Sequence, residues 1–433
     1  MSSLLADIIR RHDRGEAIGI YSVCSAHPLV IEASVIQALE DGSPLLVEAT
    51  SNQVDQFGGY TGMKPEDFRD LVLEIAREHG LEPDRIILGG DHLGPNTWQA
   101  EPAEQAMKKA EALIESYVRA GFTKIHLDCS MPCADDPTTL DDSVTAERAA
   151  RLAAVSEKAA TEVALTEKPL YIVGTEVPVP GGASETLTEV EPTDEAAARA
   201  TIGAHERAFR DAGVGEAWER VVGLVVQPGV EFDHTRVIAY ERGLARGLSQ
   251  VTEDHDGLVF EAHSTDYQTS QNLKELVEDH WAILKVGPAL TFALRESLFA
   301  LEALEAELIP EERRSNLREV VEGVMLSEPG RWQKYYHGNQ DEQRLLRSYS
   351  YSDRIRYYWN VPEVQAAQER LFSNLSETKL PLPLISQYLP LQYQKVRDGG
   401  VSAEPKALVL DHIRSVLKDY VFACDPRAEE ARV

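Results

Sequence analysis

The feature that most constrains the fold of this chain is a regular alternation of short apolar runs with longer segments of helical periodicity. Eight apolar runs rich in β-branched residues occur before residue 290, and each leads into polar residues and then a helix-like segment. This alternation predicts βα units with a parallel sheet, and runs apolar at nearly every position predict a sheet covered on both faces. The expected strands are Ile18–Val23, Pro44–Ala49, Arg85–Gly89, Lys124–Leu127, Leu170–Gly174, Val221–Val226, Gly257–Glu261 and Trp281–Val286.

The number of these runs favours a closed barrel over an open doubly wound sheet. No G-x-G-x-x-G turn follows any of them, and Gly89-Gly90 leads into Asp91-His92, so a dinucleotide-binding fold is not supported. We therefore expect a (β/α)8 TIM barrel over residues 1–308. Helices with Pro at the start or Gly after the end are expected at Pro65–His79, Glu101–Ala120 and Asp194–Ala212.

The chain is longer than the roughly 250 residues of a typical barrel, and its pattern changes near Ile309. After this point no strand pattern occurs, and helix-like segments such as Glu311–Met325 and Val361–Asn374 follow. We expect residues 309–433 to form a helical C-terminal extension packed on the barrel.

Charge and hydropathy exclude several classes of partner. The chain has 43 Lys and Arg against 72 Asp and Glu, a formal net charge of −29, which argues against binding to nucleic acid or to an anionic membrane. The first residues lack an apolar core of signal-peptide length, and no later stretch is apolar enough to span a membrane. A cytoplasmic protein is expected, and we also expect it to be a homo-oligomer.

The ends of the expected strands are rich in polar side chains. In a β/α barrel the active site lies at the C-terminal ends of the strands, so polar residues there are candidates for binding and catalysis. The candidate substrate-binding residues at these ends are Glu48, Asn52, Asn96, Asp128, Gln227, Asp266 and Lys285.

Histidines beside carboxylates follow three separate strands, which is a stronger signal than a single strand-end histidine. His92, His234 and His263 are the expected metal ligands, with Glu176 as a possible fourth. Imidazole and carboxylate donors suit a borderline divalent cation such as Zn, Mn, Co or Ni. His126 lies one residue inside its strand end, and either binds the metal or supports a ligand.

Asp91 immediately precedes His92, so in a regular strand the two side chains would point to opposite faces. If the alternation relaxes at the strand end, Asp91 can reach a substrate hydroxyl while His92 binds the metal. The alternative is that Asp91 orients His92 or caps the next helix.

An unusually basic and aromatic run, RLLRSYSYSDRIRYYW, lies within the expected extension at 344–359. Guanidinium groups and aromatic rings can bind sugar hydroxyls, phosphates and sugar rings, so we expect this run to fold over the barrel mouth, with Arg354 and Arg356 in the substrate site. The alternative is that its arginines pair with acidic barrel helices and its aromatic residues form the docking interface.

Several strings together resemble one family. They are CSAHPLVIEA, EATSNQVDQFGGYTGM, GGDHLGPN, GTEVPVPGG, VVQPGVEFDH, EAHSTDYQT, ILKVGPALTFALRE and YSDRIRYYW. They resemble the GatZ/KbaZ family, the Z-type subunit of class II D-tagatose-1,6-bisphosphate aldolase. The resemblance runs almost from end to end. Relatives have been labelled as non-catalytic aldolase subunits, as tagatose-6-phosphate kinases and as epimerases that interconvert fructose and tagatose at C4. No kinase-type phosphate loop occurs here, so the kinase label is set aside.

The chain is more distantly similar to catalytic class II aldolases. The similarity implies that Asp91 is a proton-transfer residue and that His92, His234 and His263 bind the metal. Glu176 is an alternative carboxylate for the proton transfer. Where class II aldolases have a Gly-Gly-Ser-Gly phosphate loop, this chain has HSTDYQ from His263 to Gln268. The expected activity is retro-aldol and aldol chemistry on a ketose or ketose phosphate, with epimerisation at C4 or aldol cleavage as its outcome. The alternative is a non-catalytic subunit that stabilises a separate class II aldolase catalytic subunit.

Overall fold

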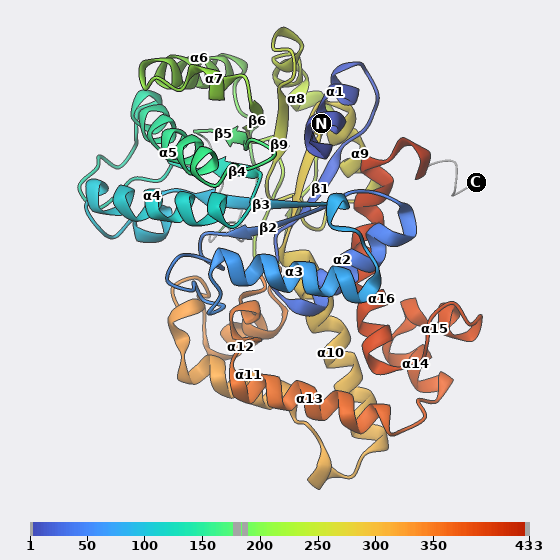
Figure 1. Ribbon diagram of the computed structural model, residues 1–433. Helices are drawn as coiled ribbons and strands as arrows, with labels where there is room; N and C mark the ends of the chain where they lie inside the picture. The colour runs from blue at the N-terminus through green and yellow to red at the C-terminus, as the bar shows by residue number, and fades with distance from the viewer. Residues whose placement is uncertain (1–2, 176–182, 184–188, 429–433) are drawn as a thin grey trace.

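The computed structural model describes residues 3–175, 183 and 189–428. Eight parallel strands close into a barrel in the order β1-β10-β9-β6-β5-β4-β3-β2, which confirms the predicted fold (Figure 1). The barrel strands are β1 (Ile20–Val23), β2 (Leu45–Thr50), β3 (Ile86–Leu93), β4 (Lys124–Leu127), β5 (Leu170–Val173), β6 (Val221–Val225), β9 (Val259–Ala262) and β10 (Ile283–Val286). A separate antiparallel pair, β7 (Glu231–Phe232) and β8 (Val237–Ile238), lies in the loop after β6.

A helix follows each barrel strand, as the alternation in the sequence predicts. These helices are α2 (Pro28–Asp41), α3 (Pro65–His79), α4 (Ala103–Arg119), α5 (Asp142–Glu162), α6 (Glu195–Asp211), α8 (Arg242–Ser249), α9 (Ser270–Glu278) and α10 (Pro288–Leu308), with the short α7 (Gly215–Trp218) after α6. Helix α3 has the predicted bounds, and left-handed Gly80 ends it, with its N–H bonded to the carbonyls of Ala76 and Arg77.

One end of the barrel interior is apolar, and the first helix of the chain closes it. Side chains such as Leu46, Ile87, Ile172 and Ile283 fill it, and Leu5 and Ile8 of α1 (Leu4–Asp13) belong to the same buried cluster. The larger core lies between the strands and the surrounding helices. The barrel is therefore a packed core, and its polar interior is confined to the other end.

The segment after α10 is helical and returns to the barrel. Its helices are α11 (Leu317–Ser327), α12 (Gln340–Tyr349), α13 (Pro362–Ser376), α14 (Leu382–Tyr388), α15 (Pro390–Arg397) and α16 (Pro405–Cys424). Helix α10 runs from the barrel toward α11 and α13, and α16 packs against α2, α9 and α10 (Figure 1). The last helix of the chain therefore belongs to the outer layer of the barrel.

The helix predicted at Glu311–Met325 begins later, at Leu317, after a single turn at Glu311–Arg313. Asn316 has a left-handed φ of 52°, and the Ser315 N–H donates to the buried carboxylate of Glu305. This contact with α10 holds the chain out of helical geometry.

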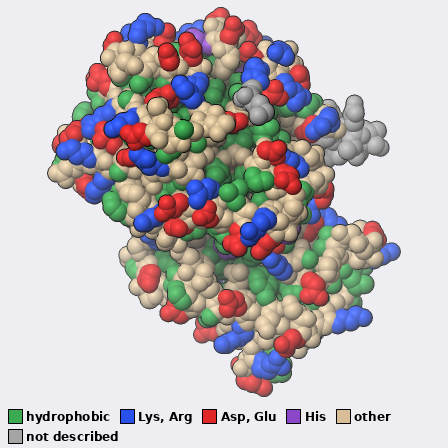
Figure 2. Space-filling model, in the orientation of Figure 1, with side chains coloured by type: hydrophobic (Ala, Val, Ile, Leu, Met, Phe, Trp, Pro, Cys, Tyr) green, Lys and Arg blue, Asp and Glu red, His purple; other side chains and the backbone are tan. Residues whose placement is uncertain are grey.

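Acidic and basic side chains are interspersed on the face of the molecule shown in Figure 2. The excess of negative charge is therefore not gathered into one acidic patch on that face. Among the described residues, no helix is long and apolar enough to cross a membrane.

Candidate active site

A cavity of about 380 Å³ opens at the C-terminal end of the barrel. Its wall combines strand ends and loops of the barrel, including Asp91, His92, His263 and Lys285, with residues of the C-terminal segment. This is the end at which β/α barrels place their active sites.

Beneath the cavity the apolar interior gives way to a layer of buried charges. The Lys124 ammonium lies 2.5 Å from Glu48 Oε1 and 2.6 Å from Glu261 Oε2, and all three side chains are fully buried. Lys285 contacts Glu48 and lies 3.0 Å from Asp91 Oδ1. Burial opposes ionisation of Glu261, but the charges of Lys124 and Lys285 outweigh it and hold its pKa well below the ordinary value. Gly89 leaves room for this layer, since a Cβ there would lie 2.6 Å from the Glu48 side chain.

Asp91 and His92 face the same site, although they are neighbours in a strand. His92 has a left-handed φ of 50°, and the pairing of β3 with β4 shifts register between Gly90 and Leu93. The bulge removes the alternation of faces that a regular strand would impose. Asp91 Oδ1 accepts from His126 Nδ1 at 2.9 Å, and His92 Nδ1 donates to Asp128 Oδ2 at 2.7 Å.

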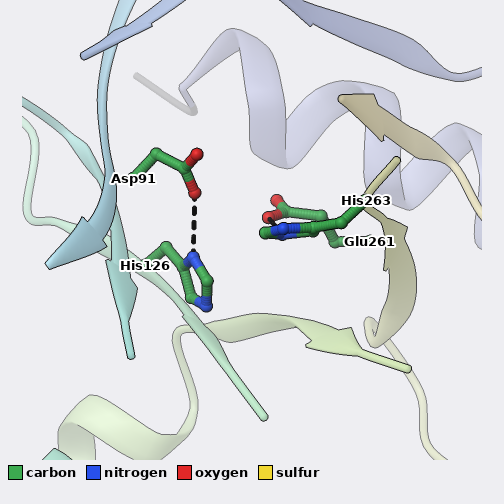
Figure 3. A group of neighbouring side chains, drawn as sticks. All are labelled: Asp91, His126, Glu261 and His263. Carbon is green, nitrogen blue, oxygen red and sulfur yellow. Dashed lines mark hydrogen bonds and ion pairs between the residues drawn. The ribbon is translucent and has the colours of Figure 1, made fainter. Parts of the chain in front are cut away.

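Three imidazoles meet at the base of the cavity. The ring centroids of His92 and His263 are 4.9 Å apart, and the His126 ring lies 5.2 Å from each of them. Figure 3 shows the side chains of Asp91, His126, Glu261 and His263 facing a common space. One donor atom from each of these four residues lies within 4.8 Å of the other three.

The donor set fits a divalent transition metal. His126 Nε2 is buried and has no hydrogen-bond partner, which is costly unless a ligand uses its lone pair. Burial lowers the pKa of His263 to about 4, so this ring is neutral at physiological pH, as metal binding requires. The Asp128 carboxylate holds His92 by Nδ1 and leaves Nε2 as its donor, a common arrangement around metal-binding histidines.

His234 is not part of this group, and His126 takes its place beside His92 and His263. The β7–β8 hairpin carries His234 at its turn, where Nε2 donates to the Tyr335 carbonyl at 3.0 Å. Nδ1 lies 3.2 Å from Ser350 Oγ. Both ring nitrogens therefore contact the C-terminal segment, because the loop after β6 forms a hairpin that carries the ring away.

The comparisons with known proteins agree with this architecture. The family model for D-tagatose-1,6-bisphosphate aldolase subunit GatZ/KbaZ-like proteins matches residues 5–425. The chain belongs to this family. A structure from Sinorhizobium meliloti 1021, described as a "probable tagatose 6 phosphate kinase", is 52% identical, with 94% of this chain and 100% of that chain covered and a TM-score of 0.86.

Two aldolase structures are more distant. The YdjI aldolase from Escherichia coli K12 is 10% identical, with 88% of this chain and 100% of that chain covered and a TM-score of 0.43. The fructose-bisphosphate aldolase from Campylobacter jejuni is 12% identical, with 86% and 91% covered and a TM-score of 0.46.

Several other residues expected in the site of this GatZ/KbaZ-like protein lie in the cavity wall or directly beside it. Asn52, Asp266, Lys285 and Arg356 line the cavity, and Glu48 lies in the charged layer beside Lys285. Glu176 lies outside the described residues.

Five expected substrate-binding residues do not line the cavity: Glu48 of the charged layer, Asp128, which holds His92, and the three residues Gln227, Asn96 and Arg354. Gln227 Oε1 accepts the N–H groups of Gly229 and Val230, so it shapes its own loop. Asn96 lies in the turn after β3 and bonds Gln99. Arg354 stacks on Tyr335, with its guanidinium carbon 3.1 Å from the ring centroid, and donates to the Arg331 carbonyl. Arg354 therefore packs within the C-terminal segment, neither in the cavity nor paired with an acidic barrel helix, whereas Arg356 lines the cavity.

The cavity also contains residues that sequence reasoning missed. His27 follows the first strand directly and could have been found by the strand-end rule that located His92. Tyr60 and Thr61 come from the long loop after β2, and no local pattern marks them as part of the site.

Proposed function

We propose that this chain is a divalent-metal-dependent enzyme that breaks and re-forms the C3–C4 bond of a ketose. Its outcome is either C4 epimerisation between tagatose and fructose or aldol cleavage. The single observation that carries the proposal is the unpartnered, buried Nε2 of His126 beside His92, His263 and Asp91. A buried imidazole nitrogen that has no hydrogen-bond partner and lies beside other donor residues suits a metal ligand.

His92, His126 and His263 are the proposed ligands. These residues would hold a divalent metal, which would supply Lewis-acid polarisation of the C2 carbonyl of the ketose. Glu261 accepts from His263 Nε2 at 2.9 Å and so orients that ring, as Asp128 orients His92.

Asp91 is the proposed proton-transfer residue. Burial opposes its ionisation, but the neighbouring positive charge, including that of Lys285, outweighs it and holds the pKa of Asp91 well below the ordinary value, so it is an anion. His126 and Lys285 both contact Oδ1, and Oδ2, which lies 3.7 Å from His92 Nε2, is the oxygen proposed to accept the substrate proton. Asp91 accepts the C4 hydroxyl proton as the C3–C4 bond breaks. C4 becomes an aldehyde carbon and the bonding electron pair remains on the C1–C3 fragment.

The same proton returns when the fragments recombine. If the fragment adds to the opposite face of the aldehyde, the configuration at C4 inverts, whereas escape of the fragments is aldolase turnover. Asn52 and Arg356 are positioned to hold sugar hydroxyls, and Tyr357 and Trp359 offer apolar ring faces in the same wall. Glu176 stays an alternative base.

The second candidate function is support of a separate catalytic aldolase subunit. The description of the family as an aldolase subunit favours it. Against it stands the buried layer of Glu48, Lys124, Glu261 and Lys285, because replacing such ion networks by apolar residues is often neutral or stabilising. A purely supporting barrel has no need of them.

The test is an assay of the purified chain alone with D-tagatose, D-fructose and their phosphates. We expect turnover of a ketose that is lost on treatment with a chelator and restored by Mn, Zn, Co or Ni. Asp91→Asn is the inactive control. If the metal-loaded chain is inactive alone and instead raises the activity or stability of a separate aldolase subunit, the supporting function is correct.

A further inference from the structure

The amino terminus of α10 opens into the cavity, directly after the last strand of the barrel. Backbone N–H groups at such a terminus, with the helix dipole behind them, bind phosphate readily, and many barrels bind a substrate phosphate in this region. The amino terminus of α10 is thus where a phosphorylated ketose would be expected to place its anion.

In this chain a carboxylate of the protein already occupies that position. Asp266 Oδ1 accepts from the Gly287 N–H at 3.0 Å and from the Ala289 N–H at 2.8 Å, and Pro288 between them has no N–H. Asp266 is buried and lines the cavity. The N–H groups that would bind a phosphate therefore have an internal acceptor.

The loop that carries Asp266 is fixed from both sides. The Thr265 hydroxyl donates to the Lys285 carbonyl at 2.6 Å, and the Tyr420 hydroxyl of α16 donates to the Thr265 carbonyl at 3.0 Å. The neighbouring residue Tyr267 has a left-handed φ of 66° and packs on Tyr351. A substrate phosphate would have to displace a carboxylate that two other elements hold in place.

A second helix amino terminus at the cavity, that of α2, is filled in a similar way. Helix α2 also begins with a proline, Pro28, and the Leu29 N–H donates to His27 Nδ1 at 3.2 Å. Both His27 and Pro28 line the cavity.

The charge of the cavity wall also disfavours a phosphorylated substrate. Among the described lining residues, Asp91 and Asp266 balance Lys285 and Arg356, leaving no net formal charge apart from the histidines. Lys285 contacts Glu48 and Asp91, and Arg356 directs Nη1 to the carbonyls of Ser352 and Asp353. A ketose bisphosphate would bring about three to four negative charges into this wall.

We infer that Asp266 stands in place of a substrate phosphate at the amino terminus of α10, so that the cavity takes an unphosphorylated ketose. The inference deepens the proposed function and rests on it for the identity of the sugar. The specificity follows from two effects: the N–H groups are already satisfied, and a fixed negative charge repels a second anion.

Binding of inorganic phosphate to Asp266→Ala, Asp266→Asn and the unmodified chain tests this directly, by calorimetry and without any turnover. Asp266→Ala frees both N–H groups, and we expect its affinity for phosphate to rise at least about tenfold. Asp266→Asn removes the charge but keeps an oxygen against Gly287 and Ala289, so its gain should be several-fold smaller. Glu231→Gln removes a nearby buried carboxylate that does not contact α10 and should gain nothing.

Equal phosphate affinity in Asp266→Ala and the unmodified chain would overturn the inference, as would equal gains in Asp266→Ala and Asp266→Asn. If Asp266→Ala does not fold, the unmodified chain still decides: it should bind or convert tagatose or fructose at least about 100-fold better than their 6-phosphates, and the reverse preference overturns the inference. Failure of the proposed function has a different signature, because an inactive chain would still show the gain of phosphate binding in Asp266→Ala.

Discussion

Asp91 and Asp128 each contact an imidazole of the site, but the contacts assign them different tasks. Asp91 faces the cavity, and we expect Asp91→Asn to keep the fold and the metal while turnover falls by about 10²–10⁴, the usual contribution of general acid–base catalysis. Asp128 lies outside the cavity lining and holds His92 through Oδ2 and Ser130 through Oδ1, so Asp128→Asn should weaken metal binding by about 10–100-fold.

Metal titration followed by measurement of kcat at saturating metal separates these two variants. Saturating metal should restore most of the turnover of Asp128→Asn and none of that of Asp91→Asn. Restoration of Asp91→Asn by excess metal would move Asp91 to a supporting role.

His126 and His234 form the second matched pair. Only His126 lies with His92 and His263, so elemental analysis should find about one divalent metal in the unmodified chain and in His234→Ala, and a large loss in His126→Ala. His234→Ala should instead lower the free energy of unfolding by about 1–2 kcal/mol, because it removes bonds to Tyr335 and Ser350. Loss of metal in His234→Ala alone would return that residue to the ligand set.

At the scale of elements, the approach of β4 to the loop after β3 depends on one glycine. A Cβ at Gly94 would lie 1.7 Å from the Asp128 carbonyl oxygen. We expect Gly94→Ala to separate the two segments, disturb the contact of His92 with Asp128, and destabilise the fold by about 1–3 kcal/mol or more.

Gly323, inside α11, is the matched control, because a Cβ there meets nothing within 4 Å. Gly323→Ala should raise the melting temperature through its helix propensity. Equal melting temperatures and equal metal binding in Gly94→Ala and the unmodified chain would contradict the prediction for Gly94.

The segment between α12 and α13 contributes one arginine to the cavity and one to packing. Arg356→Met should raise KM severalfold, since Arg356 lines the cavity, and should also lower the melting temperature, since Nη1 bonds the carbonyls of Ser352 and Asp353. Arg354→Met should leave KM unchanged and lower the melting temperature, since Arg354 stacks on Tyr335 and bonds the Arg331 carbonyl. Steady-state kinetics and thermal unfolding of the pair check this, and an unaltered KM in Arg356→Met would remove the segment from the substrate site.

At the scale of the whole molecule, buried carboxyls make stability depend on pH. Burial raises the pKa of Glu231 from 4.5 to about 7. The folded protein therefore binds this proton more tightly than the unfolded chain does, and the resulting stability is full below about pH 4.5 and lost as the pH rises through about 7.

Glu231→Gln removes this dependence and keeps an acceptor for the Phe232 N–H. The free energy of unfolding of the variant minus that of the unmodified chain should be about 3 kcal/mol larger at pH 8 than at pH 4.5. Urea unfolding at both values checks this, with the exposed Glu241→Gln as control. A difference that does not grow with pH would contradict the assignment.

Local patterns determined the elements of this protein. All eight barrel strands lie where apolar runs predicted them, because strands buried on both faces are mostly apolar. Helix α3 has its predicted bounds, because proline and glycine act within a single turn. The strand-end rule likewise predicted Asp91, His92 and His263 as candidates, since their neighbours in sequence are sufficient to place them at that end.

Only the tertiary structure decided which of these side chains meet. A register shift in β3 turns Asp91 and His92 toward the same space, and a hairpin after β6 places His234 away from His92, His126 and His263; no spacing in the sequence encodes either feature. The late start of α11 depends on Glu305, and the position of Asp266 depends on Gly287, Ala289 and Tyr420, all distant in the chain. Sequence spacing thus specified the end of the barrel at which the candidate site lies, whereas long-range hydrogen bonds specified which side chains meet there.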